Sequence, residues 1–204
     1  GNGMTEDDHD RFQFGLSRIA EAPLFIDEQG ALRIEDVRRK AREVKRETGG
    51  GLSLVVIDYL QLMTADGENR TREMTAITGA IKSLAKELRV PIIALSQLNR
   101  EVERRPNKRP VMADLRESGS IEQDADVIWA LYRDEKYNPD SVDKGLAELL
   151  WLKNRYGEGS GMTPLVWHGE FVRFDSMFGD MLSAAAGRDG AVSPAKTGRF
   201  DGAF

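Results

Sequence analysis

Two apolar stretches of the sequence each end at polar side chains that are able to do chemistry. In "SLVVIDYLQLM", residues 53–63, Asp58 directly follows a β-branched run, and "VPIIALSQ", residues 90–97, ends at Ser96 and Gln97. In nucleoside triphosphatases a carboxylate at a strand end holds magnesium, usually through water, while a polar side chain on a neighbouring strand senses the terminal phosphate. The same residues also fit a simpler interpretation, in which Asp58 caps a turn and Gln97 is a solvated loop residue.

The elements that would position these side chains alternate between helix and strand. Apolar residues recur at helical spacing in three segments, residues 12–19, 34–44 and 74–88. A short strand is predicted at "PLFID", residues 23–27, before the strands that end at Asp58 and Gln97. Apolar strands between amphipathic helices predict an α/β fold with a largely parallel sheet that is covered on both faces. Ligands of such sheets collect outside the carboxyl ends of the strands, where Asp58 and Gln97 are expected.

The C-terminal part of the chain has a different pattern. Four closely spaced apolar runs, "DVIWALYR", "LAELLWLKN", "TPLVWH" and "FVRFD", predict antiparallel hairpins. From about Ala184 the sequence is rich in Gly, Ala, Ser and Pro, a composition typical of a disordered tail. We therefore expect one folded domain over residues 1–178 and a disordered tail over residues 179–204.

Composition excludes several kinds of site. The 204 residues include no cysteine, which rules out disulfides, thiolate zinc sites and cysteine nucleophiles. The two histidines, His9 and His168, lie far apart in sequence, which argues against a Ser-His triad or a histidine metal cluster. A net charge of −5 argues against nucleic-acid binding over the whole surface, although a local basic patch would not appear in the total.

The sequence also bears on location. No stretch approaches the roughly 20 consecutive apolar residues that span a bilayer. The N-terminal residues "GNGMTEDDHD" are acidic, unlike those of a secretory signal. We therefore expect a cytoplasmic protein with no membrane partner.

Four segments together carry a resemblance to a known family. They are "VVIDYLQLM", "IIALSQLNREVERR", "KRPVMADLRESGSIEQDADVIWALYRDE" and "LKNRYGEGSG". In this order and at these intervals, the sequence resembles the RecA-type ATPase domain of the DnaB family of replicative DNA helicases, from Gly1 to about Asp175. The resemblance implies a RecA-like P-loop ATPase core, with ATP and Mg²⁺ as cofactors. It also implies single-stranded DNA and the identical subunits of a hexamer as partners, and by analogy a helicase loader and a primase.

The resemblance assigns roles to the residues around the nucleotide. Asp58 matches the Walker B acid that organises magnesium and the attacking water, and Gln97 matches the residue that couples the γ-phosphate to the DNA-facing loops. Lys153 and Arg155 match a basic pair that enters the neighbouring subunit's nucleotide site, where the arginine acts as a finger. Residues two apart on an extended segment leave the same face of a sheet. Without the resemblance, the pair would be read as exposed charges at a strand edge.

A second set of matching residues is implied in DNA binding. Arg116, Glu117 and Gly119, in "LRESGS", match the loop that follows the phosphates of single-stranded DNA through the channel of the ring. The polar residues 64–70 match a second channel loop. The alternative interpretation is that the segment 117–120 only caps a short helix at "SIEQD".

The sequence departs from the family pattern at one motif. The phosphate-binding motif G-x-x-x-x-G-K-[ST] does not occur in the 204 residues, and the glycine cluster "TGGGLS" lacks the lysine. The family's phosphate loop and catalytic glutamate lie upstream of the position that Gly1 matches, so we expect the N-terminal part of the domain to be missing. We expect the C-terminal part of a hexameric, ATP-dependent replicative helicase, which translocates on single-stranded DNA and unwinds duplexes but is inactive as this chain alone.

Three origins of such a chain fit the sequence. The chain would be a C-terminal fragment of a longer gene product, one half of a split protein completed by another chain, or a non-catalytic interaction module derived from a helicase. A RecA-fold recombinase or signalling ATPase is the alternative from a different functional class.

Overall fold

The first half of the described chain contains the long helices and two short strands, and the second half consists mainly of consecutive strands. The computed structural model describes residues 5–116, 118–157 and 159–177. Its α-helices are α1 (Glu6–Glu21), α2 (Ile34–Glu47), α3 (Arg70–Leu88) and α4 (Ser118–Asp124). Its strands are β1 (Val55–Ile57), β2 (Ile92–Ala94), β3 (Val127–Tyr132), β4 (Leu146–Asn154), β5 (Gly161–His168) and β6 (Arg173–Ser176). Short 3₁₀ helices connect them: η1 (Leu60–Leu62), η2 (Arg100–Arg104), η3 (Met112–Asp114), η4 (Asp134–Lys136) and η5 (Gly169–Phe171).

Local sequence signals set the helix ends. Helix α1 begins with a capping box, in which the Asp8 N–H donates to Thr5 Oγ1 at 3.2 Å and the Thr5 N–H donates to Asp8 Oδ2 at 3.1 Å. Helix α2 ends before Gly49 and Gly50, whose φ angles of 61° and 98° favour glycine. Asn69 caps α3 by accepting the backbone N–H of Arg72.

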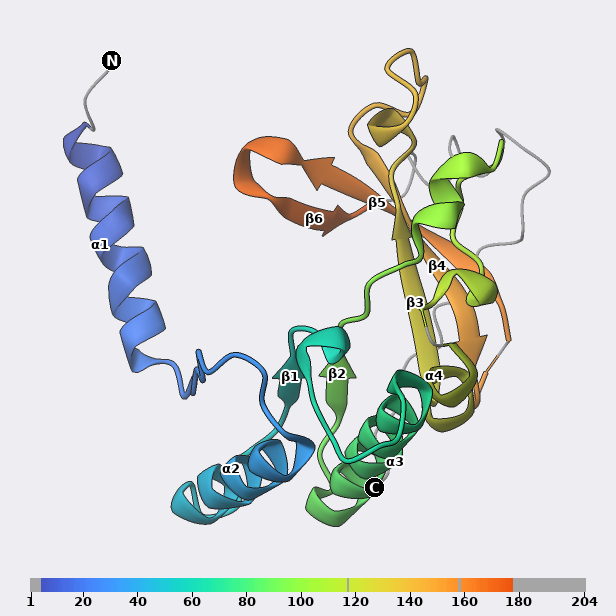
Figure 1. Ribbon diagram of the computed structural model, residues 1–204. Helices are drawn as coiled ribbons and strands as arrows, with labels where there is room; N and C mark the ends of the chain where they lie inside the picture. Colours follow the sequence, from blue (N-terminus) through green and yellow to red (C-terminus); the bar gives the residue numbers. More distant parts are fainter. Residues whose placement is uncertain (1–4, 117, 158, 178–204) are drawn as a thin grey trace.

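The strands form two sheets (Figure 1). Strands β1 and β2 are parallel, with Val55 opposite Ile92 and Ile57 opposite Ala94. Strands β3, β4, β5 and β6 form an antiparallel sheet in sequence order. The α/β fold class and the C-terminal antiparallel hairpins are therefore confirmed. Among the described strands, only β1 and β2 pair in parallel, and an isolated parallel bridge joins Arg33 to Thr64.

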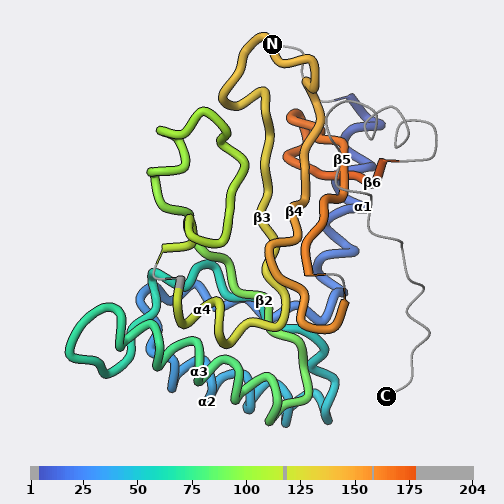
Figure 2. The backbone as a smooth tube through the Cα atoms, turned by 90° about the vertical axis from the view of Figure 1, so that its right-hand side faces the viewer, coloured from blue at the N-terminus to red at the C-terminus, as the bar shows by residue number. Residues whose placement is uncertain are grey.

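Helices α2 and α3 lie side by side in both views and pack against one face of the β1–β2 sheet (Figures 1 and 2). The fully buried side chains Met74, Ile77 and Leu84 all belong to α3. On the opposite face the apolar side chains are exposed, among them Val56 at 57% and Leu95 at 45%. The described residues thus cover one face of this sheet, whereas the sequence predicted a sheet covered on both.

The strand predicted at residues 23–27 is wrong. The structure has no strand there, and the side chains of Leu24, Phe25 and Ile26 are exposed. An apolar run forms a strand only when a neighbouring strand accepts its backbone hydrogen bonds, and none of the described strands pairs with this run. Helix α1 precedes it and stands apart from both sheets, with no buried residue (Figure 1).

The remaining predictions on organisation concern the ends of the chain. The predicted tail over residues 179–204 and its boundary at residue 178 lie outside the described residues. Within the described part of the chain, no helix is both long and apolar enough to cross a membrane.

Candidate functional site

The ends of β1 and β2 lie together, as the parallel pairing requires. The Leu95 N–H donates to the Ile57 carbonyl oxygen at 2.9 Å, and the Leu60 N–H donates to the Leu95 carbonyl oxygen at 2.9 Å. Asp58 follows β1 directly and is exposed, and its peptide bond to Tyr59 is cis. Asp58 and Gln97 therefore belong to the same edge of the sheet.

One residue that the sequence reasoning missed connects these two strand ends. The side-chain amide of Gln61, on η1, donates from Nε2 to Ser96 Oγ at 3.0 Å. Its Oε1 accepts the backbone N–H of Gln97 at 3.2 Å. The only sequence signal for this role is that Gln61 is the first amide side chain after β1 and Asp58.

Gln97 also shares a hollow with a residue predicted to bind DNA. The hollow is about 410 Å³ and is lined by Gln97, Leu98, Asn99, Arg100 and Arg116. Leu98 forms an antiparallel bridge with Leu115, and the Asn99 N–H donates to the Asp114 carbonyl oxygen at 2.7 Å. The structure thus places Arg116 beside the segment that continues from Gln97.

Of the other two predicted DNA-binding residues, the structure describes Gly119 but not Glu117. Glu117 lies outside the described residues. Gly119 is in the first turn of α4, so a short helix exists at "SIEQD" as the alternative interpretation predicted, but it already begins at Ser118. A Cβ at Gly119 would meet no atom of the described residues within 4 Å. The fold itself therefore leaves room for a side chain at this position.

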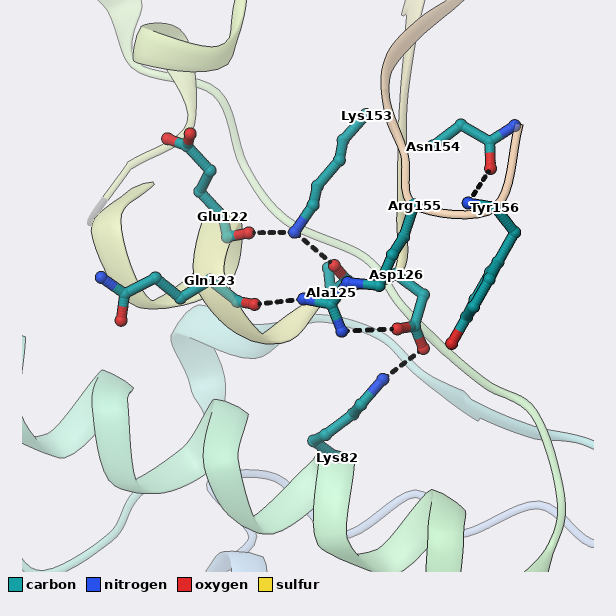
Figure 3. A network of polar contacts seen from close by, with 9 residues as sticks. All are labelled: Lys82, Glu122, Gln123, Ala125, Asp126, Lys153, Asn154, Arg155 and Tyr156. Carbon is teal, nitrogen blue, oxygen red and sulfur yellow. Dashed lines mark hydrogen bonds and ion pairs between the residues drawn. The ribbon is translucent and has the colours of Figure 1, made fainter. Parts of the chain in front are cut away.

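Lys153 and Arg155 converge on the end of α4 (Figure 3). Lys153 Nζ donates to the carbonyl oxygens of Glu122 and Ala125, the latter at 2.7 Å. Arg155 Nη2 donates to the Gln123 carbonyl oxygen at 2.9 Å. Cations near a helix C-terminus stabilise its unpaired carbonyl groups. In this structure the basic pair therefore caps α4, and it contacts a different segment from the one that holds Asp58 and Gln97.

Asp126 is the acidic centre of this cluster. Its carboxylate accepts Lys82 Nζ from α3 and Arg155 Nη1, the latter at 3.0 Å (Figure 3). The hydrogen bond from Lys82 is the main cause that lowers the pKa of Asp126, and the charges of Lys82, Arg155 and Lys153 act in the same direction. Asp126 thus joins α3 to Arg155, which directly follows β4.

Replacing Asp126 by asparagine is expected to make stability less dependent on pH. Because folding lowers the pKa of Asp126 below its usual 3.8, its ionic contribution is complete above that pH and disappears as the pH falls through the folded value. Asp126→Asn should therefore lower the melting temperature at pH 7, and the difference from the parent chain should shrink at about pH 3. Thermal unfolding followed by circular dichroism measures both. Asp140→Asn, at an exposed position between β3 and β4, is the control. An equal loss at both pH values would contradict the ionic role.

The described residues suit a magnesium ion that binds together with a nucleotide, and they do not form a metal site of their own. Within the described part of the chain, no three His, Cys, Asp or Glu side chains come together as a metal site. Mg²⁺ is commonly held by one or two carboxylates together with substrate phosphates and water. The exposed carboxylate of Asp58 at a strand end suits that arrangement better than a permanent, all-protein metal site.

Comparison with known proteins shows the family to which the chain belongs. Residues 1–176 match the family described as "DnaB-like helicase C terminal domain". The replicative DNA helicase DnaB of Pasteurella multocida (strain Pm70) is 51% identical over 180 residues, which are 87% of this chain and 38% of that protein. The chain thus spans less than two fifths of that relative.

Two solved structures agree. A DnaB-like replicative helicase, described with its interactions with primase, matches with a TM-score of 0.81 and 36% identity, over 87% of this chain and 42% of its own. A solved ATPase domain matches with a TM-score of 0.80 and 37% identity, over 85% of this chain and 61% of its own. The sequence match over residues 1–176 and the shared fold lead to one conclusion: the chain belongs to the DnaB-like helicase C-terminal domain family.

Proposed function

We propose that this chain is the C-terminal part of a hexameric replicative DNA helicase, which couples ATP hydrolysis to translocation on single-stranded DNA and to duplex unwinding. The observation that carries the proposal is the hollow shared by Gln97 and Arg116. Gln97 and Arg116 both line it, and this proximity supports a motor in which a phosphate sensor acts on a neighbouring DNA contact. Family membership favours a helicase over a recombinase or a signalling ATPase.

The nucleotide would be ATP with Mg²⁺. Asp58 would hold the ion through water, and the bound ion would offset phosphate charge during hydrolysis. Gln97 would face the terminal phosphate from the neighbouring strand end. The phosphate-loop motif does not occur in the 204 residues, and we propose that another segment or another chain would supply it.

Lys153 and Arg155 would complete the site of a neighbouring subunit. A guanidinium and an ammonium group two residues apart suit a target that carries several negative oxygens. Their contacts with the end of α4 would hold both side chains near one another before the neighbour's nucleotide arrives. Identical subunits are therefore proposed partners. Single-stranded DNA, a primase and a helicase loader are further proposed partners, and the proposed location is the cytoplasm.

A chimera tests this function directly. In the chimera, residues 5–176 replace the aligned segment of the Pasteurella multocida helicase. We expect it to hydrolyse Mg-ATP and unwind a forked duplex, and we expect Asp58→Ala in the chimera to abolish hydrolysis. The 204-residue chain alone should show no Mg-ATP binding in titration calorimetry, because one carboxylate without phosphate-binding N–H groups gives little nucleotide affinity.

Two results would count against the proposal. One is a chimera that assembles, as judged by light scattering, yet does not hydrolyse ATP. The other is micromolar Mg-ATP affinity of the chain alone, which would reveal a phosphate site unlike that of the family.

A further inference from the structure

Gln61 occupies an unusual position between the two strand ends. It lies on the 3₁₀ turn that follows Asp58, and it is half-buried. Both ends of its amide are used on consecutive residues of the neighbouring segment, Ser96 and Gln97. A single amide that both donates and accepts fixes its target in position and orientation more tightly than one bond would.

The turn that carries Gln61 is itself held firmly. Its flanking side chains Leu60 and Met63 are buried, each 3% exposed. Arg70, at the start of α3, donates to the Gln61 carbonyl oxygen and to the Met63 carbonyl oxygen, both at 3.1 Å. Arg70 is in turn held by Glu73 at 2.6 Å. The Gln61 side chain therefore extends from a fixed base.

The segment on the other side of Gln61 continues toward Arg116. The Gln97 backbone N–H donates to Gln61 Oε1, and Gln97 as a whole is exposed. The next residue, Leu98, is bridged to Leu115, which precedes Arg116. A displacement of the Gln97 backbone would thus be passed to the 114–116 segment through main-chain contacts.

We propose that Gln61 is a positioning residue that holds the Gln97 backbone against the turn following Asp58. In this way it links the position of the Asp58 turn to the position of the 114–116 segment. Gln61 touches neither nucleotide nor DNA in this role. The proposal rests on the proposed function, because it assigns Gln61 to the coupling between the nucleotide end and the DNA end of the site. A residue that only stabilised the contact between two loops would change the stability of the fold but not the coupling between the nucleotide and DNA ends of the site.

Two variants separate the contributions of the amide. Gln61→Met keeps a similar length and loses both hydrogen bonds. Gln61→Glu keeps an acceptor for the Gln97 N–H, and the Ser96 hydroxyl can turn to donate to it. Gln13→Met, at an exposed position of α1, is the matched control.

The first measurement is amide hydrogen exchange in the 204-residue chain. Gln61→Met should speed exchange of the Gln97 N–H by about fivefold or more, the effect of losing one net hydrogen bond. Gln61→Glu should restore most of the protection, and Gln13→Met should change nothing at Gln97. Unchanged protection in Gln61→Met would overturn the proposal whatever the function of the protein is.

The second measurement is the ratio of DNA-stimulated to basal ATP turnover in the chimera. Gln61→Met should reduce this ratio by about two- to thirtyfold, the range for changes along coupled networks, and Gln61→Glu should recover it. A normal ratio in Gln61→Met beside reduced Gln97 protection would overturn the coupling role. A parent chimera without DNA-stimulated turnover would instead refute the proposed function, while the exchange result would still stand.

Discussion

Replacing Arg155 by alanine in the chimera is expected to reduce ATP turnover by about 10³-fold or more while Mg-ATP binding persists. An arginine finger acts on charge that develops in the transition state, and removing such a finger costs about 10³ to 10⁵ in rate. Ground-state binding depends mainly on the phosphate loop, which this change does not touch. Single-turnover hydrolysis measures the rate, and fluorescent-nucleotide titration measures the affinity.

The structure shows a second way in which this variant could lose activity. Arg155 binds the Asp126 carboxylate and the Gln123 carbonyl oxygen, so alanine also removes a cap from α4. Asp126→Asn weakens the same anchorage but leaves the guanidinium in place. If Arg155 acts as a finger, Asp126→Asn should retain far more turnover than Arg155→Ala. Equal losses in the two variants would assign the effect to α4. Arg173→Ala, at an exposed arginine paired with Asp175, is the control for loss of a surface charge.

Mixed assemblies test whether the finger acts across a subunit boundary. Arg155→Ala and Asp58→Ala subunits are each expected to be inactive alone. In a mixed ring, some interfaces would pair an intact Asp58 with an intact Arg155 from the neighbour, so turnover should exceed the sum of the two single variants. Turnover that never exceeds that sum at any mixing ratio would contradict action in trans.

The parts of the fold that were predictable are those that local sequence determines. Thr5 with Asp8 forms the expected capping box, and the run "LAELLWLKN" coincides with β4. Alternation and capping operate within a few residues, so the sequence displays them directly. The failed strand at residues 23–27 depended on a partner strand, and an apolar run does not reveal whether a partner is present.

The candidate site was predictable to a similar degree. The strand-end positions of Asp58 and Gln97 follow from the pattern of apolar runs, because parallel strands bring their carboxyl ends to one edge. The role of Gln61 did not follow, since it bonds to a residue 35 positions away. Spacing also predicted that Lys153 and Arg155 would leave the same face of the sheet, but not that their described contacts would lie at the end of α4.

Replacing Arg116 by alanine is expected to weaken single-stranded DNA binding by the chimera about equally for all sequences. An interaction with phosphate carries no base information, so its removal should not alter sequence preference. The substitution should also reduce the magnitude of the salt dependence, by up to about 0.7 in the logarithmic slope for each phosphate that the protein no longer neutralises. Filter binding of several oligonucleotides across a salt series measures both quantities. An unchanged slope would exclude Arg116 as a phosphate ligand.

Gly119→Val tests whether DNA phosphates approach the backbone of the same segment, because the substitution changes no charge. A Cβ at this position meets no described atom within 4 Å, and valine has a higher helix propensity than glycine, so α4 should survive the change. If DNA phosphates approach the backbone here, the valine side chain would obstruct them from outside the fold. Affinity should then fall while the salt slope changes less than in Arg116→Ala, because no charge is removed. Ser83→Val, at an exposed position of α3, is the matched control for adding an apolar side chain. Full DNA affinity in both Gly119→Val and Arg116→Ala would leave the segment as a helix start alone, and single-stranded DNA would have to bind elsewhere on the chimera.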